Sequence, residues 1–135
     1  MRIRLIGLSL ILVSLWLVSC GRQEPQLALA VTRIDVGDVV NGEIVGRDVV
    51  VRNEGAGPLV VANVSTSCGC TTATLEPMTL DPGASGVLHI EFDSGAHGPD
   101  LTGPLMRQVF IASNDPQQPE AQLELVANIL PRTMP

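Results

Sequence analysis

The fold is decided by residues 44–65, which read IVGRDVVVRNEGAGPLVVANVS. Val49 and Val51 lie two residues apart, so on an extended chain they share one face, while the opposite face is partly solvated. Turn-forming residues at 53–55 and 57–58 then interrupt the apolar pattern before a second apolar stretch begins at Leu59. The segment therefore predicts two consecutive β-strands with a turn between them.

The same pattern continues outward, because apolar stretches rich in β-branched residues alternate with turn signals and no long helical period occurs. The predicted core consists of valine, leucine and isoleucine, with Phe92 and Phe110 as its aromatic residues. A change of phase after Val61 predicts a β-bulge near residues 62–63. We expect strands at 29–36, 44–52, 59–65, 72–75, 87–92, 106–112 and 123–129, a tight turn at 80–83 and a mobile hairpin loop at 94–103.

Seven or eight short strands in about a hundred residues favour an all-β fold, an immunoglobulin-like Greek-key β-sandwich. The chain is too short for a second domain of ordinary size once its N-terminal segment is set aside. We divide it into a lipoprotein signal peptide (1–19), a lipid anchor and tether (20–27), the sandwich domain (28–130) and a C-terminal tail (131–135).

The N-terminal segment has the layout of an export signal. Two arginines precede an uncharged apolar run from Leu5 to Val18, which is shorter than a membrane span requires, and Ser19 stands directly before Cys20. Residues 17–20, Leu-Val-Ser-Cys, are similar to the lipobox of bacterial lipoproteins, in which the cysteine is acylated before cleavage. The alternative is an ordinary signal peptide with an incidental cysteine.

The charge of the mature chain excludes some classes of partner. It loses Arg2 and Arg4 of the eight basic residues and keeps all 14 acidic residues, which leaves a formal net charge of −8 and no lysine. Such a surface repels phosphate backbones and acidic lipid headgroups, so neither nucleic acid nor an acidic membrane surface is an expected partner. We therefore expect the lipid on Cys20 to hold the protein to a membrane, exposed outside the cytoplasm in the bacterial cell envelope.

Five short motifs occur in a fixed order along the domain: Asn53-Glu54-Gly55, Pro58-Leu59, Ser67-Cys68-Gly69-Cys70-Thr71, Pro82-Gly83 and Ser113-Asn114-Asp115-Pro116. This series resembles the bacterial domain-of-unknown-function family 1573 over roughly residues 31–129. The resemblance implies a secreted protein, often a lipoprotein, with a domain similar to Hydin-like and sperm-protein-like immunoglobulin folds. It implies no particular biochemical role.

Cys68 and Cys70 form the one predicted chemical centre. Residues i and i+2 of an extended chain project to the same face, and Gly69 permits the local contraction that a bond between the two sulfurs needs. Lipidation of Cys20 leaves just these two thiols in an oxidising compartment. Four interpretations stay open: a structural disulfide, a redox-active pair in a small and reducible ring, a two-thiolate site for Cu(I), or two packed free thiols.

The remaining polar residues carry no catalytic signature. We expect His89 on the solvated face of its strand beside Glu91, and His97 in the glycine-rich loop, as surface residues. Zinc ordinarily takes four protein ligands, and these histidines are the other candidates beside the cysteines. Three loop aspartates lack the regular spacing of a calcium site and are predicted to serve turns and solubility: Asp93, Asp100 and Asp115.

The sequence therefore predicts a protein that is not an enzyme, has no cofactor and has no firm metal site, with Cys68 and Cys70 as the candidates for a metal. Its predicted function is that of a lipid-anchored, monomeric immunoglobulin-like module that binds another envelope protein. The alternative is a small thiol-redox or Cu(I)-handling envelope protein that uses Cys68 and Cys70.

The lipobox-like motif generates the first testable prediction. Mass spectrometry of the mature protein should find a diacylated N-terminal Cys20, and Cys20→Ser should release the protein from the membrane fraction, because the acidic domain has no other attraction to lipid. An unmodified mature N-terminus, or unchanged membrane association of the variant, contradicts the predicted anchor.

Overall fold

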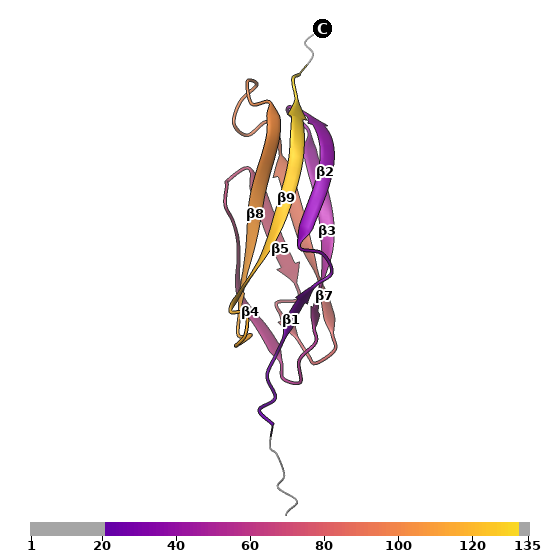
Figure 1. The fold of residues 1–135 in the computed structure, drawn as a ribbon, viewed down its shortest axis with the longest axis vertical. Coiled ribbons are helices and arrows are strands. Elements are labelled where there is room, and N and C mark those ends of the chain that lie inside the picture. The colour runs from indigo at the N-terminus through magenta and orange to yellow at the C-terminus, as the bar shows by residue number, and fades with distance from the viewer. Residues whose placement is uncertain (1–20, 133–135) are drawn as a thin grey trace, which may run out of the picture.

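The computed structural model describes residues 21–132, so the predicted signal peptide and Cys20 lie outside the described residues. The described residues form nine strands (Figure 1). None of these residues belongs to a helix that is long and apolar enough to cross a membrane. The strands are β1 (Leu27–Leu29), β2 (Arg33–Val40), β3 (Ile44–Asn53), β4 (Leu59–Thr66), β5 (Thr71–Glu76), β6 (Thr79–Leu80), β7 (Ser85–Asp93), β8 (Gly103–Ser113) and β9 (Glu120–Leu130).

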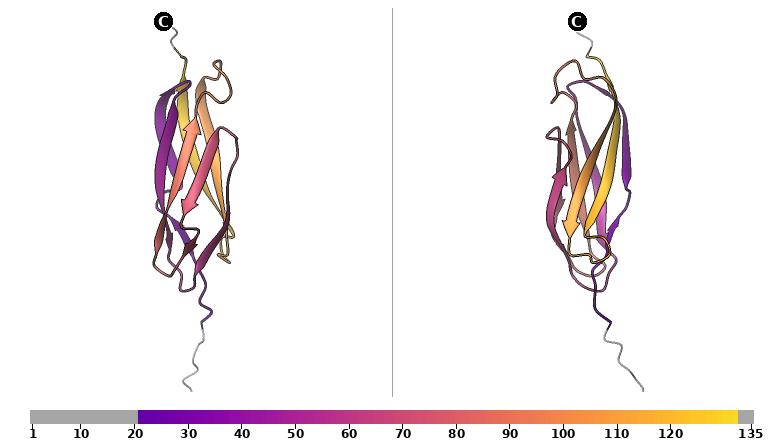
Figure 2. Two further views of the ribbon diagram at one scale, coloured as in Figure 1. Left: turned by 180° about the vertical axis from the view of Figure 1, so that it is seen from behind. Right: turned by 60° about the vertical axis from the view of Figure 1, so that its left-hand side comes forward.

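The strands pack as two sheets face to face. One sheet has the order β1-β3-β7-β5 and is antiparallel throughout, and the other has the order β2-β9-β8-β4-β6. Figure 1 looks onto the five-stranded sheet, and the left view of Figure 2 looks onto the four-stranded sheet from behind. The predicted all-β, immunoglobulin-like sandwich is confirmed, with nine strands in place of seven or eight.

The first predicted strand, 29–36, is in fact two strands in different sheets. Ala30 still donates its N–H to the carbonyl of Val50 in the first sheet, whereas the carbonyl of Thr32 already accepts the N–H of Glu124 in the second. β1 therefore pairs with β3, and β2 runs parallel to β9. No glycine or proline marks the crossing at residues 30–32, so the apolar pattern runs through it without a break.

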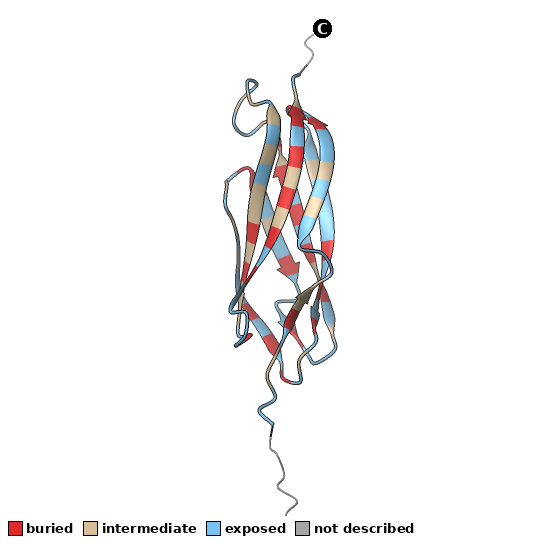
Figure 3. Ribbon diagram, in the orientation of Figure 1, coloured by how far each residue is buried: buried red, intermediate tan, exposed pale blue. Residues whose placement is uncertain are grey.

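The core lies between the two sheets, where buried positions alternate along the strands (Figure 3). Val49 and Val51 are buried, as predicted, and so is Phe92 with its alternate neighbours on β7. Phe110 differs from the prediction: it lies out of phase with the fully buried Val109 and is only partly covered on the outer face of β8. The predicted bulge is confirmed as a register shift between Val61 and Asn63, where β4 pairs with β8.

The chain enters the sandwich at one end, called here the entry end, where residues 24–27 lie beside the turn at 54–57. The carbonyl of Glu24 accepts the N–H groups of Ala56 and Gly57, and the carbonyl of Gln26 accepts the N–H of Glu54. Gly57 has no room for a side chain, because a Cβ there would lie 2.0 Å from the carbonyl oxygen of Gln23. The later part of the predicted tether, 20–27, is thus packed against the domain.

Asn53 organises the entry end with a fully buried carboxamide. Its Nδ2 donates to the carbonyls of Gly57 (2.8 Å) and Leu80 (2.9 Å), and its Oδ1 accepts the N–H groups of Gly55 (3.0 Å) and Gln26 (3.2 Å). All four hydrogen-bonding positions of the amide are therefore used, which is what a buried amide needs to offset its desolvation. The amide joins the incoming chain, the 54–57 turn and β6.

Asp115 is the second buried polar group at the entry end: it serves a turn, as predicted, but it is buried and so is not the solubility residue that the sequence predicts. Its Oδ2 accepts the N–H of Leu27 at 2.8 Å, and its Oδ1 accepts the N–H groups of Gln117 (2.8 Å) and Gln118 (3.2 Å). Burial opposes ionisation, but the three donors outweigh it, and the pKa of Asp115 is lowered. The carboxylate thereby attaches β1 to the turn between β8 and β9.

The Asn53 amide predicts a large effect of a one-atom change. Asn53→Asp replaces the Nδ2 donor with an acceptor that faces the two carbonyls of Gly57 and Leu80, so the free energy of unfolding should fall by about 3 kcal/mol or more. Urea unfolding measures the change. The matched substitution at an exposed site, Asn63→Asp, should change stability by less than about 0.5 kcal/mol. Equal stability of the two variants would contradict the assigned role.

The lowered pKa of Asp115 predicts a specific dependence of stability on pH. A carboxyl whose folded-state pKa lies below its unfolded value stabilises the fold above the unfolded value, about 3.9, and loses that contribution as pH falls through the folded pKa. The gap in unfolding free energy between wild type and Asp115→Asn should therefore be widest near neutral pH and narrow on acidification. Urea titrations at several pH values measure it, with Asp100→Asn in an exposed loop as the control. A gap that does not change with pH argues against this contribution.

Candidate functional site

The turn at 67–70 places Cys68 and Cys70 between β4 and β5, at the end of the sandwich opposite the entry end (Figure 1). Their sulfur atoms lie side by side, and their Cα atoms are 5.2 Å apart, within the separation that a disulfide tolerates. Cys70 is 3 % exposed, whereas Cys68 is only partly buried. A disulfide in the exported protein stays a prediction that this geometry permits.

Hydrogen bonds from three neighbouring strands hold the cysteine turn. Thr66 Oγ1 lies within hydrogen-bond distance of the carbonyls of Thr71 (2.7 Å) and Cys68 (2.9 Å), and its single O–H donates between them across the base of the turn. The N–H of Asp93 at the end of β7 donates to the carbonyl of Cys70. On the other side, the N–H of Gln108 on β8 donates to the hydroxyl of Ser67 at 3.0 Å. The two sulfurs are therefore fixed relative to both sheets.

Two side chains from later in the chain meet the sulfurs. His97 Nε2 lies 3.0 Å from Cys68 Sγ, and Arg107 Nε donates to Cys70 Sγ at 3.1 Å. The ligand atoms of Cys68, Cys70 and His97 all lie within 4.8 Å of one another, so the group could also hold a soft metal ion. His97 is exposed, as predicted, but its contact with Cys68 was not expected from the sequence.

The loop that carries His97 is anchored from inside, whereas the sequence predicts a mobile hairpin loop at 94–103. Asn41, which is 2 % exposed, donates its two Nδ2 protons to the carbonyls of Gly98 (2.9 Å) and Leu101 (3.1 Å), and the carbonyl of Ser94 lies 3.4 Å from the same nitrogen. The hydroxyl of Ser94 accepts the N–H of Gly42, and its single O–H points between the carbonyls of Val40 (3.0 Å) and Glu43 (2.8 Å). Asn41 therefore sets the path of the loop on either side of His97.

Arg107 had a signal in the sequence that could have marked it. On β8 it shares the phase of Val109 and Ile111, which face the interior and are fully buried. An arginine at a core-facing position of a strand needs a partner for its charge. The position of Arg107 on β8 could therefore have predicted that its guanidinium contacts another polar group. His97 had no comparable signal, because nothing in its local sequence relates it to Cys68.

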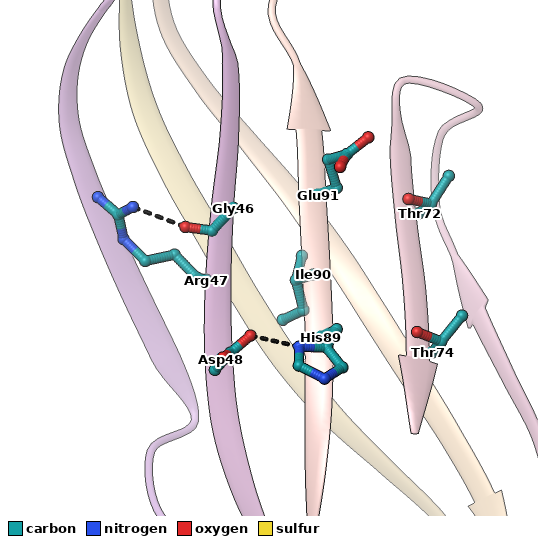
Figure 4. Close-up of a pocket in the computed structure, with 8 residues that line it drawn as sticks. All are labelled: Gly46, Arg47, Asp48, Thr72, Thr74, His89, Ile90 and Glu91. Atoms are coloured by element: carbon teal, nitrogen blue, oxygen red, sulfur yellow. Dashed lines mark hydrogen bonds and ion pairs between the residues drawn. The ribbon is translucent and has the colours of Figure 1, made fainter. Parts of the chain in front are cut away.

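A shallow hollow of about 340 Å³ lies on the outer face of the four-stranded sheet. His89 and Asp48 point toward each other across β7 and β3 and are joined by a hydrogen bond in its lining, with both side chains exposed (Figure 4). This confirms the predicted solvated position of His89. The hollow borders β5, and its lining is Gly46, Arg47, Asp48, Thr72, Thr74, His89, Ile90 and Glu91.

The architecture defines a class: an immunoglobulin-like, PapD-like β-sandwich whose first strand segment crosses between the sheets. Within that class, the chain belongs to the family described as Protein of unknown function (DUF1573), which it matches over residues 27–129. The resemblance found in the sequence motifs is thereby confirmed. A search of the curated proteins gave no match.

Several solved structures share the fold. A protein of unknown function from Porphyromonas gingivalis is 28 % identical, with a TM-score of 0.68, and the match covers 78 % of this chain and 47 % of that one. The PapD-like domain 7 of human CEP192 is 10 % identical, with a TM-score of 0.62 over 98 % and 99 % of the two chains. The Vibrio cholerae VesB protease is 14 % identical, with a TM-score of 0.62 over 76 % and 32 %. The chain thus spans less than half the length of two of these proteins.

Proposed function

We propose that this protein is a lipid-anchored module of the bacterial cell envelope that binds an extended segment of another envelope protein along β5. The lipobox-like residues 17–20 support the anchor, and the PapD-like sandwich supports a binding role rather than an enzymatic one. The observation that carries the proposal is the difference between β5 and β2, the edge strand on the far side of the other sheet.

β5 is the open edge of the four-stranded sheet, because of the described strands it pairs only with β7. Its register with β7 is regular from Thr71 to Glu76, and residues 71–75 carry no charge. β2, the edge strand on the far side of the five-stranded sheet, is protected in the way that natural edges usually are. It contains a register shift, a glycine with φ of 74°, and three charged residues: Arg33, Asp35 and Asp38.

The ladder between β5 and β7 shows which main-chain groups a partner strand would meet. The N–H of Asp93 donates to the carbonyl of Cys70, and bonded positions alternate along an antiparallel pair. Residues 72 and 74 therefore bond to β7, while the N–H and carbonyl of Ala73 point away from it. A partner strand would pair with Ala73 and Leu75, because the N–H of Thr71 already bonds to the carbonyl of Cys68 and its carbonyl accepts Thr66 Oγ1.

The hollow beside β5 supplies a place for one side chain of that partner. Thr72 and Thr74 project from β5 into its rim, and Asp48 and Glu91 add carboxylates nearby (Figure 4). A basic side chain suits this surface, and the net charge of −8 on the mature chain attracts a basic segment at longer range. The added strand gives affinity, and the hollow gives selectivity.

The β5 proposal predicts that two substitutions abolish binding without unfolding the domain. Ala73→Pro removes the outward N–H, and Thr74→Arg places a positive charge in the hollow that is to receive a basic side chain. The measurement is crosslinking and pull-down from membranes of the native host with the mature protein as bait. Thr102→Arg, in an exposed loop, is the matched control and should bind like wild type.

Circular dichroism and urea unfolding of each variant verify that the bait is folded. A protein captured equally by wild type, Ala73→Pro and Thr74→Arg contradicts the β5 site. Self-association of the purified domain through β5 also contradicts it, because the partner is then a second copy of the chain.

A further inference from the structure

Each sulfur of the cysteine pair has a partner of its own, and the two partners differ. Cys70 is buried and accepts a hydrogen bond from Arg107 Nε at 3.1 Å, whereas Cys68 is more open and lies 3.0 Å from His97 Nε2. The N–H of Cys70 also donates to Cys68 Sγ at 3.1 Å. A disulfide that only braces a turn needs neither a guanidinium nor an imidazole at its sulfurs.

We propose that Cys68 and Cys70 are a thiol–disulfide exchange pair, in which Cys68 is the sulfur attacked and Cys70 is the sulfur that leaves. This activity goes beyond the binding role proposed above and does not depend on it. The co-reactant is a dithiol, a molecule or protein with two thiols that can close to a disulfide.

Burial and charge select the same sulfur for attack. A bulky thiolate can reach the partly exposed Cys68 but not Cys70, which is 3 % exposed. The bond then breaks toward Cys70, whose thiolate stands beside the permanently charged guanidinium of Arg107. A better stabilised thiolate is a better leaving group, so the arrangement speeds attack at Cys68 and not at Cys70.

The exchange balances in two steps. A thiolate of the dithiol forms a bond to Cys68 Sγ, the Cys68–Cys70 bond breaks, and its electron pair goes to Cys70 Sγ beside Arg107. The second thiolate of the dithiol then attacks the dithiol's own sulfur in the mixed disulfide, and Cys68 leaves as a thiolate. The pair gains two electrons, and the dithiol loses two electrons and two protons as it closes to a disulfide; the protons pass through water to the two cysteine thiolates.

His97 assists the second step by direct contact with the leaving sulfur. In the tautomer that carries its proton on Nε2, it donates a hydrogen bond to Cys68 Sγ and so stabilises that sulfur as it leaves. Asn41 fixes the loop around His97 through the carbonyls of Ser94, Gly98 and Leu101, so the ring stays within reach of Cys68.

A Cu(I) site at the same residues is the competing use. Cys68, Cys70 and His97 would supply three donor atoms of the soft type that Cu(I) prefers. Arg107 argues for exchange over the metal, since it places a fixed positive charge against one donor sulfur, where it repels an incoming cation.

The test locates the mixed disulfide. The mature protein, shown by non-reducing peptide mapping to contain the closed Cys68–Cys70 ring, is mixed with glutathione, quenched with acid, alkylated and sequenced by mass spectrometry. We expect glutathione on Cys68 and the alkyl label on Cys70.

A second experiment measures the rate of reduction by dithiothreitol. Arg107→Gln should slow this reduction about tenfold, because it removes the charge beside the leaving thiolate.

Two further variants separate this role from a structural one. Arg52→Gln, at an exposed site on β3, should be reduced at the wild-type rate, and His97→Gln should let the Cys68–glutathione adduct accumulate. Glutathione found equally on both sulfurs, or equal rates for Arg107→Gln and Arg52→Gln, would overturn the proposal. Free thiols at Cys68 and Cys70 in the exported protein would also overturn the proposal. So would a reduced protein that binds one Cu(I) through His97, if Arg107→Gln also leaves the exchange rate unchanged.

Discussion

The sandwich depends on the buried carboxamide of Asn53. A side chain that offers two donors and two acceptors in one plane can join four backbone groups at once, and here it joins the incoming chain, the 54–57 turn and β6. Asp115 plays a similar part at the edge of the opposite sheet, where its carboxylate accepts three backbone N–H groups. The entry end therefore closes through polar groups that have hardly any freedom to rearrange.

This constraint separates the sequence motifs into two groups. The motifs around Asn53, Pro58, Gly83 and Asp115 meet at the entry end, where the N–H and carbonyl of Asn53 also bond to residues 83 and 84. The cysteine motif lies at the other end of β3, a strand of 10 residues, which puts about 30 Å between the two groups. The entry end and the cysteine turn are therefore separate parts of the sandwich.

The sequence predicted what short-range periodicity determines. The two-residue period placed Val49, Val51 and Phe92 in the core, and a phase change predicted the bulge near residues 62–63, where the register shifts between Val61 and Asn63. The sequence did not predict the crossing between β1 and β2, because the alternation of side chains along the chain continues unchanged where the chain passes from one sheet to the other. It also missed the meeting of His97 and Arg107 with the cysteines, since those contacts depend on how a loop and a strand pack around a turn about 30 residues away.

The proposed anchor and the two proposed sites fit one orientation of the molecule. The described chain enters at the end where Glu24 and Gln26 bond to the 54–57 turn, so a lipid on Cys20 would bring that end toward the membrane. β5 would then run away from the membrane surface, and Cys68 would lie near the far end. An acidic domain gains nothing by lying flat on acidic headgroups. Both sites would therefore face the aqueous envelope, where an extended protein segment and a soluble dithiol can reach them.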